Sequence, residues 1–172
     1  MTQLFTMSEA VKTSYSQVYL TSLNYREGEL SVDAFKGQTN GLCGAAVPGG
    51  LFLGLGCWGG RVPFTVEVHD VAPAVDASWD EIVEASCRFE HLPVALTGCD
   101  GDCAYPLPLT TGEYRVRFCA KGYGESKQVG GLCDPAIESY LLILWPETQR
   151  ADEVIKQTSA KAAHFHDEVR NR

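Results

Sequence analysis

The sequence has no long hydrophobic segment. Its longest apolar run is YLLILW, residues 140–145, which is far shorter than the roughly 20 apolar residues of a membrane-spanning helix. Residues 1–17 also lack a basic stretch followed by an apolar one, the pattern of a secretory signal. We therefore expect a cytoplasmic protein with no membrane partner.

Positive charge is scarce in this chain. It has 14 lysines and arginines against 22 aspartates and glutamates, a formal net charge of −8. Such a protein repels nucleic acid at long range and attracts basic proteins. The acidic residues are scattered rather than gathered in a block, so they do not form an acidic tail. The charge balance argues against a nucleic-acid partner and favours a basic protein partner.

Signatures of several enzyme classes are also missing. The Gly-rich run GGLFLGLGCWGG, residues 49–60, has neither the lysine nor the following helix of a phosphate-binding loop. No cysteine has the local setting of a nucleophile, such as a glycine-flanked turn or a position directly before a helix. An enzyme with a cysteine nucleophile stays the alternative, because cysteines and histidines distant in sequence could meet in space: Cys57, Cys87 or Cys119 with His69 or His91.

The rest of the composition is that of a globular domain. The chain has 172 residues, of which 45% are hydrophobic and 21% are charged, and this is enough for a buried core within one domain. Its 17 glycines gather mainly between positions 37 and 60, which favours many turns over long helices. We expect residues 1–172 to form a single domain.

Alternation of apolar and polar residues predicts β-strands along most of the chain. The clearest examples are residues 62–68 and 114–120. In the second of these, Arg115 and Arg117 alternate with apolar residues, and with Lys121 we expect them to face solvent. Other segments are typical of strands by composition: 14–23, 29–35 and 51–58.

Two later segments need separate interpretation. Residues 79–89 fit either a strand or a helix, and we prefer a strand because the segment lies between other strands. Residues 139–146 are almost continuously apolar, which predicts a central strand that is covered on both faces.

The two ends of the chain differ in pattern. Residues 1–12 have little apolar content and predict a short helix or an N-terminal arm. In residues 151–171 the apolar positions, among them Val154, Phe165 and Val169, recur at helical spacing and predict an amphipathic helix. About eight strands followed by one helix indicate a mainly-β fold, an antiparallel β-sandwich with a C-terminal amphipathic helix.

The segment TGCDGDCA, residues 97–104, has two cysteines close together, Cys99 and Cys103. Asp-Gly between strand-like residues is a strong hairpin signal, so we prefer a plain hairpin tip. A redox-labile pair and a weak metal site are the alternatives, although a second pair of ligands for a metal is missing. The chain has seven cysteines, an odd number, and no visible export signal, so we expect all of them to be reduced, with no metal or other cofactor.

Three stretches resemble a group of small bacterial β-sandwich proteins: SYSQVYL, LPLTTGEYRVRFCAKG and YLLILWPE. The first two are similar to the competence protein J family, inhibitors of a DNA-entry nuclease, with an early Ser-Tyr-x-Gln strand and a late Leu-Pro-x-Gly-x-Tyr strand. The inserted Thr111 and the C-terminal helix depart from that pattern. The resemblance implies a β-sandwich with an inhibitory role and carries over no catalytic residues. The matching positions are Ser14, Tyr15, Gln17, Leu107, Pro108, Gly112 and Tyr114.

These observations favour a non-enzymatic binding protein that neutralises a basic toxin or nuclease by contact. We place the partner-binding surface at Trp79, Asp80, Glu81 and Glu84, because acidic groups speed association with a basic protein and aromatic side chains anchor it. Trp79 could equally be a core residue at the start of a strand. A third possibility is a β-sandwich whose Gly-rich loops form the mouth of a ligand pocket.

Overall fold

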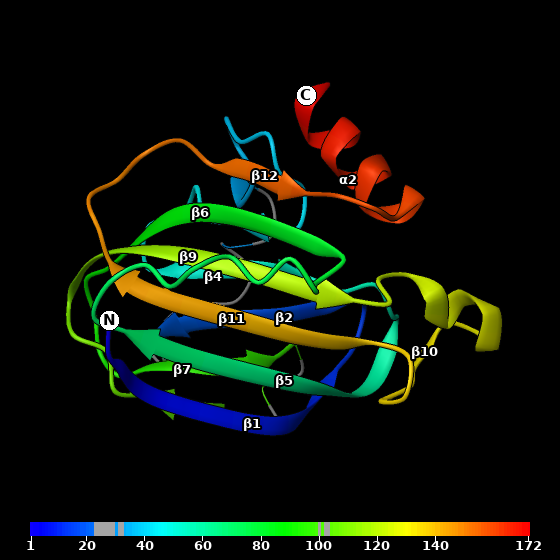
Figure 1. Cartoon of the computed structure of the whole chain (residues 1–172), viewed down its shortest axis with the longest axis horizontal. Helices are drawn as coiled ribbons and strands as arrows, with labels where there is room; N and C mark the ends of the chain where they lie inside the picture. The colour runs from blue at the N-terminus through cyan, green and yellow to red at the C-terminus, as the bar shows by residue number, and fades with distance from the viewer. Residues whose placement is uncertain (23–29, 31–32, 100, 102–103) are drawn as a thin grey trace.

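Two β-sheets packed face to face make up most of the molecule (Figure 1). The structure is a computed structural model that describes residues 1–22, 30, 33–99, 101 and 104–172. The strands in these residues are β1 (Gln3–Thr13), β2 (Gln17–Ser22), β3 (Cys43–Gly44), β4 (Gly50–Gly54), β5 (Gly59–His69), β6 (Glu81–Phe89), β7 (Val94–Gly98), β8 (Ala104–Leu107), β9 (Gly112–Lys121), β10 (Leu132–Cys133), β11 (Ser139–Pro146) and β12 (Glu153–Lys156). The helices are the short 3-10 helix η1 (Glu125–Val129) and the α-helix α2 (Ala160–Arg170).

Among the described residues, the large sheet has seven strands and the small sheet has five. The large sheet has the order β1-β5-β11-β9-β6-β12, with β10 beside β5, and the small sheet has the order β3-β4-β2-β7-β8. Neighbours are antiparallel except that β10 and β11 run parallel to β5. The predicted mainly-β sandwich with a C-terminal helix is therefore confirmed. Strand β11 lies between β5 and β9, the central place that its apolar sequence predicts.

Apolar side chains that alternate along the strands fill the space between the sheets. Phe64 on β5, Phe118 on β9 and Tyr140 on β11 are buried there with their rings stacked, and the Phe118 and Tyr140 centroids lie 5.8 Å apart. Strand β6 contributes every second residue from Val83 to Phe89 to the same core. The ambiguous segment 79–89 is thus a strand, as preferred, and it begins at Glu81.

Both ends of the chain contain a strand that the sequence did not predict. Residues 1–12 are neither an arm nor a helix, because β1 pairs with β5 from Gln3 to Thr13 as an edge strand. Its weak apolar content follows from this position, since most of β1 is exposed. At the other end the helix begins at Ala160 rather than at residue 151, because residues 153–156 extend the large sheet as β12.

Residues 14–23 and 29–35, which were both predicted as strands, do not pair with each other in the part of the chain that the structure describes. Strand β2 pairs with β4 and β7 instead. Residues 29, 31 and 32 lie outside the described residues, and Leu30 and Asp33 have helical backbone.

Helix α2 is fixed to a loop that precedes β3. The ring nitrogen Nδ1 of His166 accepts a hydrogen bond from the backbone N–H of Gly41 at 2.9 Å. A Cβ atom at Gly41 would lie 2.2 Å from the backbone oxygen of Phe165, so only glycine permits this close approach. Asp152 accepts further hydrogen bonds from Thr39 and Asn40 of the same loop. The contacts hold the helix beside the small sheet, where its Phe165 side reaches the site described below.

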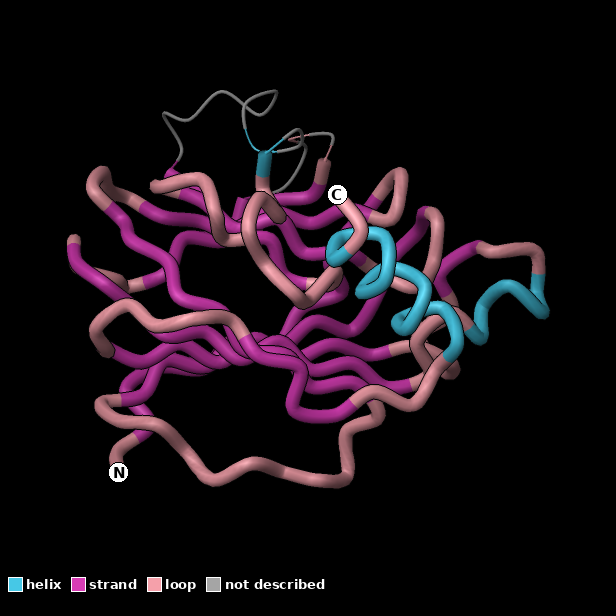
Figure 2. Tube along the Cα trace, turned by 90° about the horizontal axis from the view of Figure 1, so that it is seen from above, coloured by secondary structure: helices cyan, strands magenta, loops and turns pink. Residues whose placement is uncertain are grey.

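Residues 70–80 form a long connector over the outer face of the large sheet. Figure 2 shows it as the extended loop that runs beside the sheet, on the side away from α2. The carbonyl oxygens of Pro73 and Ala74 accept hydrogen bonds from the guanidinium of Arg117 on β9. This face is therefore covered rather than solvated. No helix in the described part of the chain has the length and apolar character needed to span a membrane.

Candidate functional site

The surface predicted at Trp79, Asp80, Glu81 and Glu84 is largely not a surface. Glu84 is only 3% exposed and lies on the covered outer face of the large sheet. Its carboxylate oxygens are 3.0 Å from Nε of Arg115 and 2.8 Å from Nη2 of Arg117. The assumed exposure of Glu84, and of the arginine row that contains Arg115 and Arg117, is therefore wrong: these opposite charges satisfy one another inside the protein.

Glu81 is also buried, and it holds the turn before α2. Its carboxylate accepts hydrogen bonds from the backbone N–H groups of Thr158 and Ser159. Trp79 and Asp80 are half-buried. The Lys121 ammonium lies 5.2 Å from the Trp79 ring centre, and Asp80 accepts a hydrogen bond from the Gly122 N–H. Each of the four residues has a contact within the protein. Their binding to a partner stays a prediction.

The cysteines differ from the expectation that all are reduced. Cys57, in the loop between β4 and β5, and Cys133 on β10 form a disulfide. The sequence could not indicate it, because 76 positions separate the two cysteines. Disulfides persist mainly in oxidising compartments, so this bond counts against the cytoplasmic location expected from the sequence. Cys99 is half-buried, whereas Cys103 lies outside the described residues; the hairpin, redox and metal alternatives for this pair stay predictions.

The other described cysteines are poor candidates for a nucleophile. Burial raises the pKa of the Cys43 and Cys119 thiols to about 12 and raises that of Cys87 well above its usual value. A thiol that stays protonated is neither a nucleophile nor a metal ligand. His69, one of the suggested partners, instead contacts Glu67 at 2.8 Å. Among the described residues no group of three or more histidines, cysteines and acidic residues could hold a metal ion.

A strained turn marks a different site. Strands β1 and β2 are joined at Ser14–Gln17, where the Gln17 N–H donates to the Ser14 carbonyl. The central residues Tyr15 and Ser16 have φ values of 56° and 61°, and they are the non-glycine residues with positive φ in the described chain. Turns of this kind favour Asn-Gly, because a left-handed conformation costs other residues about 1–2 kcal/mol each. Strain of this type gathers at binding and active sites.

The strained turn is held from behind by two neighbouring segments. The Ser16 N–H donates to the Trp58 carbonyl, and the Ser16 carbonyl accepts from the Leu55 N–H. The Trp58 N–H in turn donates to the carbonyl of Gly131. The disulfide at Cys57 joins the same two segments covalently, so the turn rests on a rigid base.

Large apolar side chains are exposed on this base. Tyr15 is 62% exposed, Trp58 56% and Leu132 59%. The Tyr15 and Trp58 rings pack edge to face with centroids 5.4 Å apart, and Leu132 is paired in register with Gly59, the residue after Trp58. We call Tyr15, Trp58 and Leu132 the Tyr15 surface. Exposed aromatic side chains on a rigid base are typical of protein-binding surfaces.

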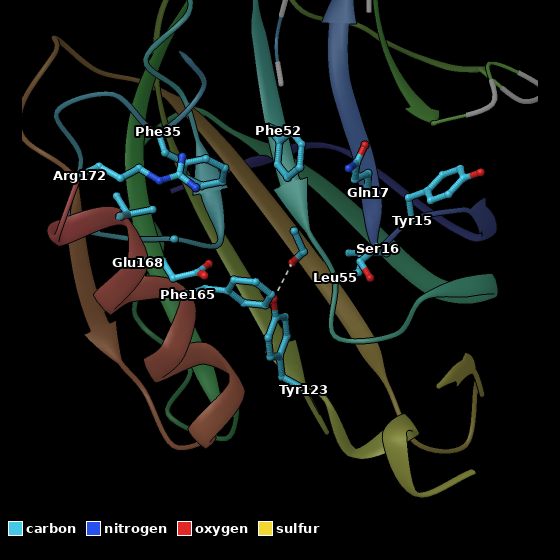
Figure 3. Close-up of a pocket in the computed structure, with 13 residues that line it drawn as sticks. Tyr15, Ser16, Gln17, Phe35, Phe52, Leu55, Tyr123, Phe165, Glu168 and Arg172 are labelled. Atoms are coloured by element: carbon cyan, nitrogen blue, oxygen red, sulfur yellow. Dashed lines mark hydrogen bonds between the residues drawn. The ribbon is translucent and has the colours of Figure 1, made fainter. Parts of the chain in front are cut away.

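A cavity of about 240 Å³ adjoins the Tyr15 surface. We call it the aromatic pocket, because Phe35, Phe52, Tyr123 and Phe165 line it together with Tyr15. Figure 3 shows the rings of Phe35, Phe52, Tyr123 and Phe165 around a common space, with Gln17 from β2 on one side and α2 on the other, whereas the Tyr15 ring points outward. Glu168 and Arg172 contribute charged groups from the helix side. Tyr15 belongs to both features and joins them into one candidate site.

The sequence contains weak signals for this site. Trp58 stands between Cys57 and two glycines, a place where a large aromatic residue cannot be covered by its neighbours in the chain. Tyr15 belongs to the Ser-Tyr-x-Gln motif, which we interpreted as the start of a strand. The meeting of residues 15, 58 and 132 depends on the pairing of distant strands, which no local pattern encodes.

The comparisons with known proteins show similarity in fold. No family model matches the chain, and no curated protein matches it in sequence. A solved structure described as crocagin biosynthetic gene J aligns over 86% of this chain and 100% of its own length, with a TM-score of 0.57 and 14% identity. The crystal structure of ComJ from Bacillus subtilis, inhibitor of the DNA-degrading activity of NucA, aligns over 85% of this chain and 98% of its own, with a TM-score of 0.54 and 9% identity. The distant resemblance to competence protein J is therefore confirmed at the level of the fold.

Proposed function

We propose that this chain is a non-enzymatic protein that inhibits a basic toxin or nuclease by binding to it through the Tyr15 surface. The observation that carries the proposal is Tyr15, a large aromatic residue that is 62% exposed on a strained, rigidly supported turn. A folded protein gains no core packing from such a residue. A partner that covers Tyr15 and Trp58 would gain the burial of two aromatic rings, the side chains that dominate many interfaces.

The fold likeness to ComJ supports the inhibitory part of the proposal, because that protein inhibits the DNA-degrading activity of NucA. The net charge of −8 supports a basic partner, since it favours long-range attraction. The acidic charge and the exposed apolar side chains lie in different places. Lys12 and Arg61 lie beside Trp58 and Leu132, so the acidic charge is not concentrated at the Tyr15 surface. In this proposal charge speeds the encounter and the apolar residues hold the complex.

A cysteine-nucleophile enzyme has less support. Cys57 is in a disulfide and the thiols of Cys87 and Cys119 have raised pKa values, so none of the cysteines suggested for that role carries a ready thiolate. A ligand-binding sandwich is favoured by one observation, the aromatic pocket, which is treated in the next subsection.

The proposal is tested by inhibition of DNA degradation. The probes are NucA and any basic toxin or nuclease that a gene next to this one encodes. We expect the wild-type chain to inhibit at least one of them, and the double variant Tyr15→Ser/Trp58→Ser to bind at least about 30-fold more weakly, the loss typical of one hot-spot residue. The control is Val71→Ser/Val75→Ser, which removes exposed apolar side chains from the connector instead.

Two results would contradict the proposal. Inhibition of neither probe by the folded wild-type chain would remove the inhibitory function. Equal binding by the Tyr15→Ser/Trp58→Ser variant and its control would place the interface elsewhere. In that case the Trp79 and Asp80 region is the next candidate, and Asp80→Asn would slow association at low salt more than Asp76→Asn does.

The cytoplasmic location forms a separate part of the proposal. The disulfide between Cys57 and Cys133 is the observation against this location, so the state of these two cysteines in living cells tests this part of the proposal. Alkylation of cells before lysis, followed by mass spectrometry of the peptides that contain these cysteines, measures their state directly. A disulfide present before lysis would favour an oxidising compartment.

A further inference from the structure

We propose that the aromatic pocket binds a single aromatic ring that carries a hydrogen-bond donor, as in indole or phenol. The ring could be a free small molecule or the tryptophan or tyrosine side chain of a protein partner. The second source rests on the proposed function, whereas binding of the free ring does not.

The size of the pocket sets the size of the ligand. Its volume is about 240 Å³, whereas a dry cavity of about 150 Å³ in another protein accommodates benzene. The pocket can therefore hold a ring of one or two fused cycles. Pockets for drug-sized ligands and nucleotides usually measure about 300–1,000 Å³, so the volume argues against a whole nucleotide or cofactor.

The walls of the pocket favour an aromatic ligand. Phe52 packs edge to face against Phe35, with centroids 5.4 Å apart, so one wall is a fixed pair of rings. Tyr123 is buried, and its hydroxyl donates a hydrogen bond to the Gly54 carbonyl at 3.2 Å. The polar atom of this side chain is therefore already hydrogen-bonded within the wall of the pocket. A ligand ring between these residues and Phe165 gains edge-to-face or stacked contacts beyond simple burial.

One carboxylate at the pocket gives the ligand a polar requirement. Glu168 lines the pocket, and Figure 3 shows its carboxylate pointing from α2 toward the space beside Phe165. A carboxylate accepts hydrogen bonds and donates none when ionised. His164 Nε2 lies 3.5 Å from Oε1 of this exposed carboxylate, and an indole N–H or a phenol O–H would replace water at its remaining lone pairs. This contact distinguishes these rings from purely apolar ones of equal size.

The proposal is tested with free indole and the full chain, by titration of backbone amide resonances in NMR. We expect saturable shifts for residues that line the pocket, with a dissociation constant of about 1 mM for a fragment of this size. Benzothiophene has the same shape without the N–H and should bind about fivefold more weakly, the value of one hydrogen bond. Glu168→Gln should reduce indole binding more than benzothiophene binding.

A second variant fills the pocket. A Cβ atom at Gly54 would make only ordinary contacts, 3.6 Å from the Leu42 carbonyl oxygen and 3.8 Å from the Tyr123 hydroxyl. We therefore expect Gly54→Val to fold, which its circular dichroism spectrum checks, and to place methyl groups at the cavity, so that indole binds at least tenfold more weakly. The matched control is Thr6→Val on the exposed part of β1, which should bind indole as the wild type does.

The outcomes separate this proposal from the proposed function. No saturable shifts with indole, or equal shifts in Gly54→Val and wild type, would overturn the pocket as an aromatic site and leave inhibition through Tyr15 and Trp58 untouched. If N-acetyltryptophanamide binds as well as indole, the pocket admits a side chain with its main chain attached, which supports a protein source. If indole binds and the amide does not, a free small molecule is the source.

Discussion

The outer face of the large sheet and the turn that joins β1 to β2 reverse the usual relation between polarity and exposure. The outer face of the large sheet has Glu84, Arg115 and Arg117, and these charged residues are at most 4% exposed. In the connections between the two sheets, the turn between β1 and β2 exposes Tyr15 and the loop between β4 and β5 exposes Trp58, each by more than half. The comparison teaches that charge in this protein is used for internal structure, whereas apolar side chains are left available for a partner.

The difference in exposure arises because chain segments cover the charged residues and leave the aromatic ones open. On the large sheet, residues 70–80 and 147–152 cross the face and supply carbonyl acceptors to Arg115 and Arg117. Both guanidinium groups are therefore hydrogen-bonded, as burial requires, although Nη2 of Arg115 has no partner among the described residues. At the turn before β2, the backbone groups of Leu55 and Trp58 support the turn from behind, and the side chains of Tyr15 and Trp58 remain exposed.

The largest loss of stability is expected from a change on the covered outer face of the large sheet. Glu84→Gln removes the negative charge that Arg115, Arg117 and Arg150 share, leaving buried guanidinium groups without compensation. We expect a loss of about 3–5 kcal/mol in the free energy of unfolding, the usual result of breaking a buried ion pair. Urea denaturation measures it. Glu153→Gln, at an exposed carboxylate 3.7 Å from Arg150, should change stability by less than about 0.5 kcal/mol; similar losses in both variants would break the comparison.

Loss of the disulfide tests the rigid base of the open site. We expect Cys57→Ala/Cys133→Ala to lower the free energy of unfolding by about 2–4 kcal/mol, since the bond closes a long loop. Binding to an inhibited partner should weaken as well, because Trp58 and Leu132 are adjacent to these cysteines. A fully stable variant with unchanged binding would show that the hydrogen bonds around Ser16 fix the surface unaided.

The strained turn predicts opposite changes in stability and binding. Tyr15→Asn/Ser16→Gly introduces the residues that left-handed turn positions favour, and we expect it to raise the free energy of unfolding by about 1 kcal/mol. The same variant removes the Tyr15 ring and should weaken partner binding. Thermal denaturation and the inhibition assay together measure the two effects. A less stable variant would mean that the Tyr15 ring stabilises the monomer, and the functional interpretation of the strain would fail.

The smallest effect concerns pH and the contact of α2 with its loop. Burial, followed by the charge of nearby Arg170, lowers the pKa of His166, while Asp167 and Asp152 oppose the shift. The unfolded chain then binds a proton more readily than the folded one, so stability is lost as the pH falls from about 6.5 toward the lowered pKa. Urea denaturation at pH 7.5, 6.0 and 5.0 should show this slope in the wild type.

Two variants assign that slope to its source. His166→Ala should be less stable at neutral pH, because the Gly41 N–H no longer has the ring as an acceptor. It should also lose the part of the pH dependence that His166 contributes, because the titrating ring is gone. His164→Ala, at an exposed histidine on the same helix, should retain the slope. An unchanged slope in His166→Ala would exclude His166 as its cause.

The fold was largely predictable because its strands have strong local signals. The alternation in residues 62–68 and the apolar run 139–146 place their strands correctly, since both patterns depend only on which faces are covered. Strand β1 has no such signal, because an edge strand with exposed faces needs few apolar residues. Residues 153–156 were assigned to the helix because Val154 and Ile155 also fit helical spacing.

The candidate site was less predictable for a physical reason. We chose Glu81 and Glu84 because acidic residues are usually exposed, whereas their burial depends on arginines and backbone groups supplied by other segments. Tyr15 and Trp58 looked like ordinary strand residues. Their exposure results from the crossing of β1 into β2 and from a disulfide between distant cysteines, and these are properties of tertiary structure.

The central place of β11 has a consequence for synthesis on the ribosome. Strands β5 and β9 are both made before β11, yet each pairs with it along one edge in the finished protein. A nascent chain that ends before Ser139 therefore presents two unsatisfied strand edges, one on each side of an empty position. Such edges recruit strands from other molecules, so incomplete chains should depend on chaperones and should aggregate when released early, whereas addition of residues 139–146 closes the sheet in one step.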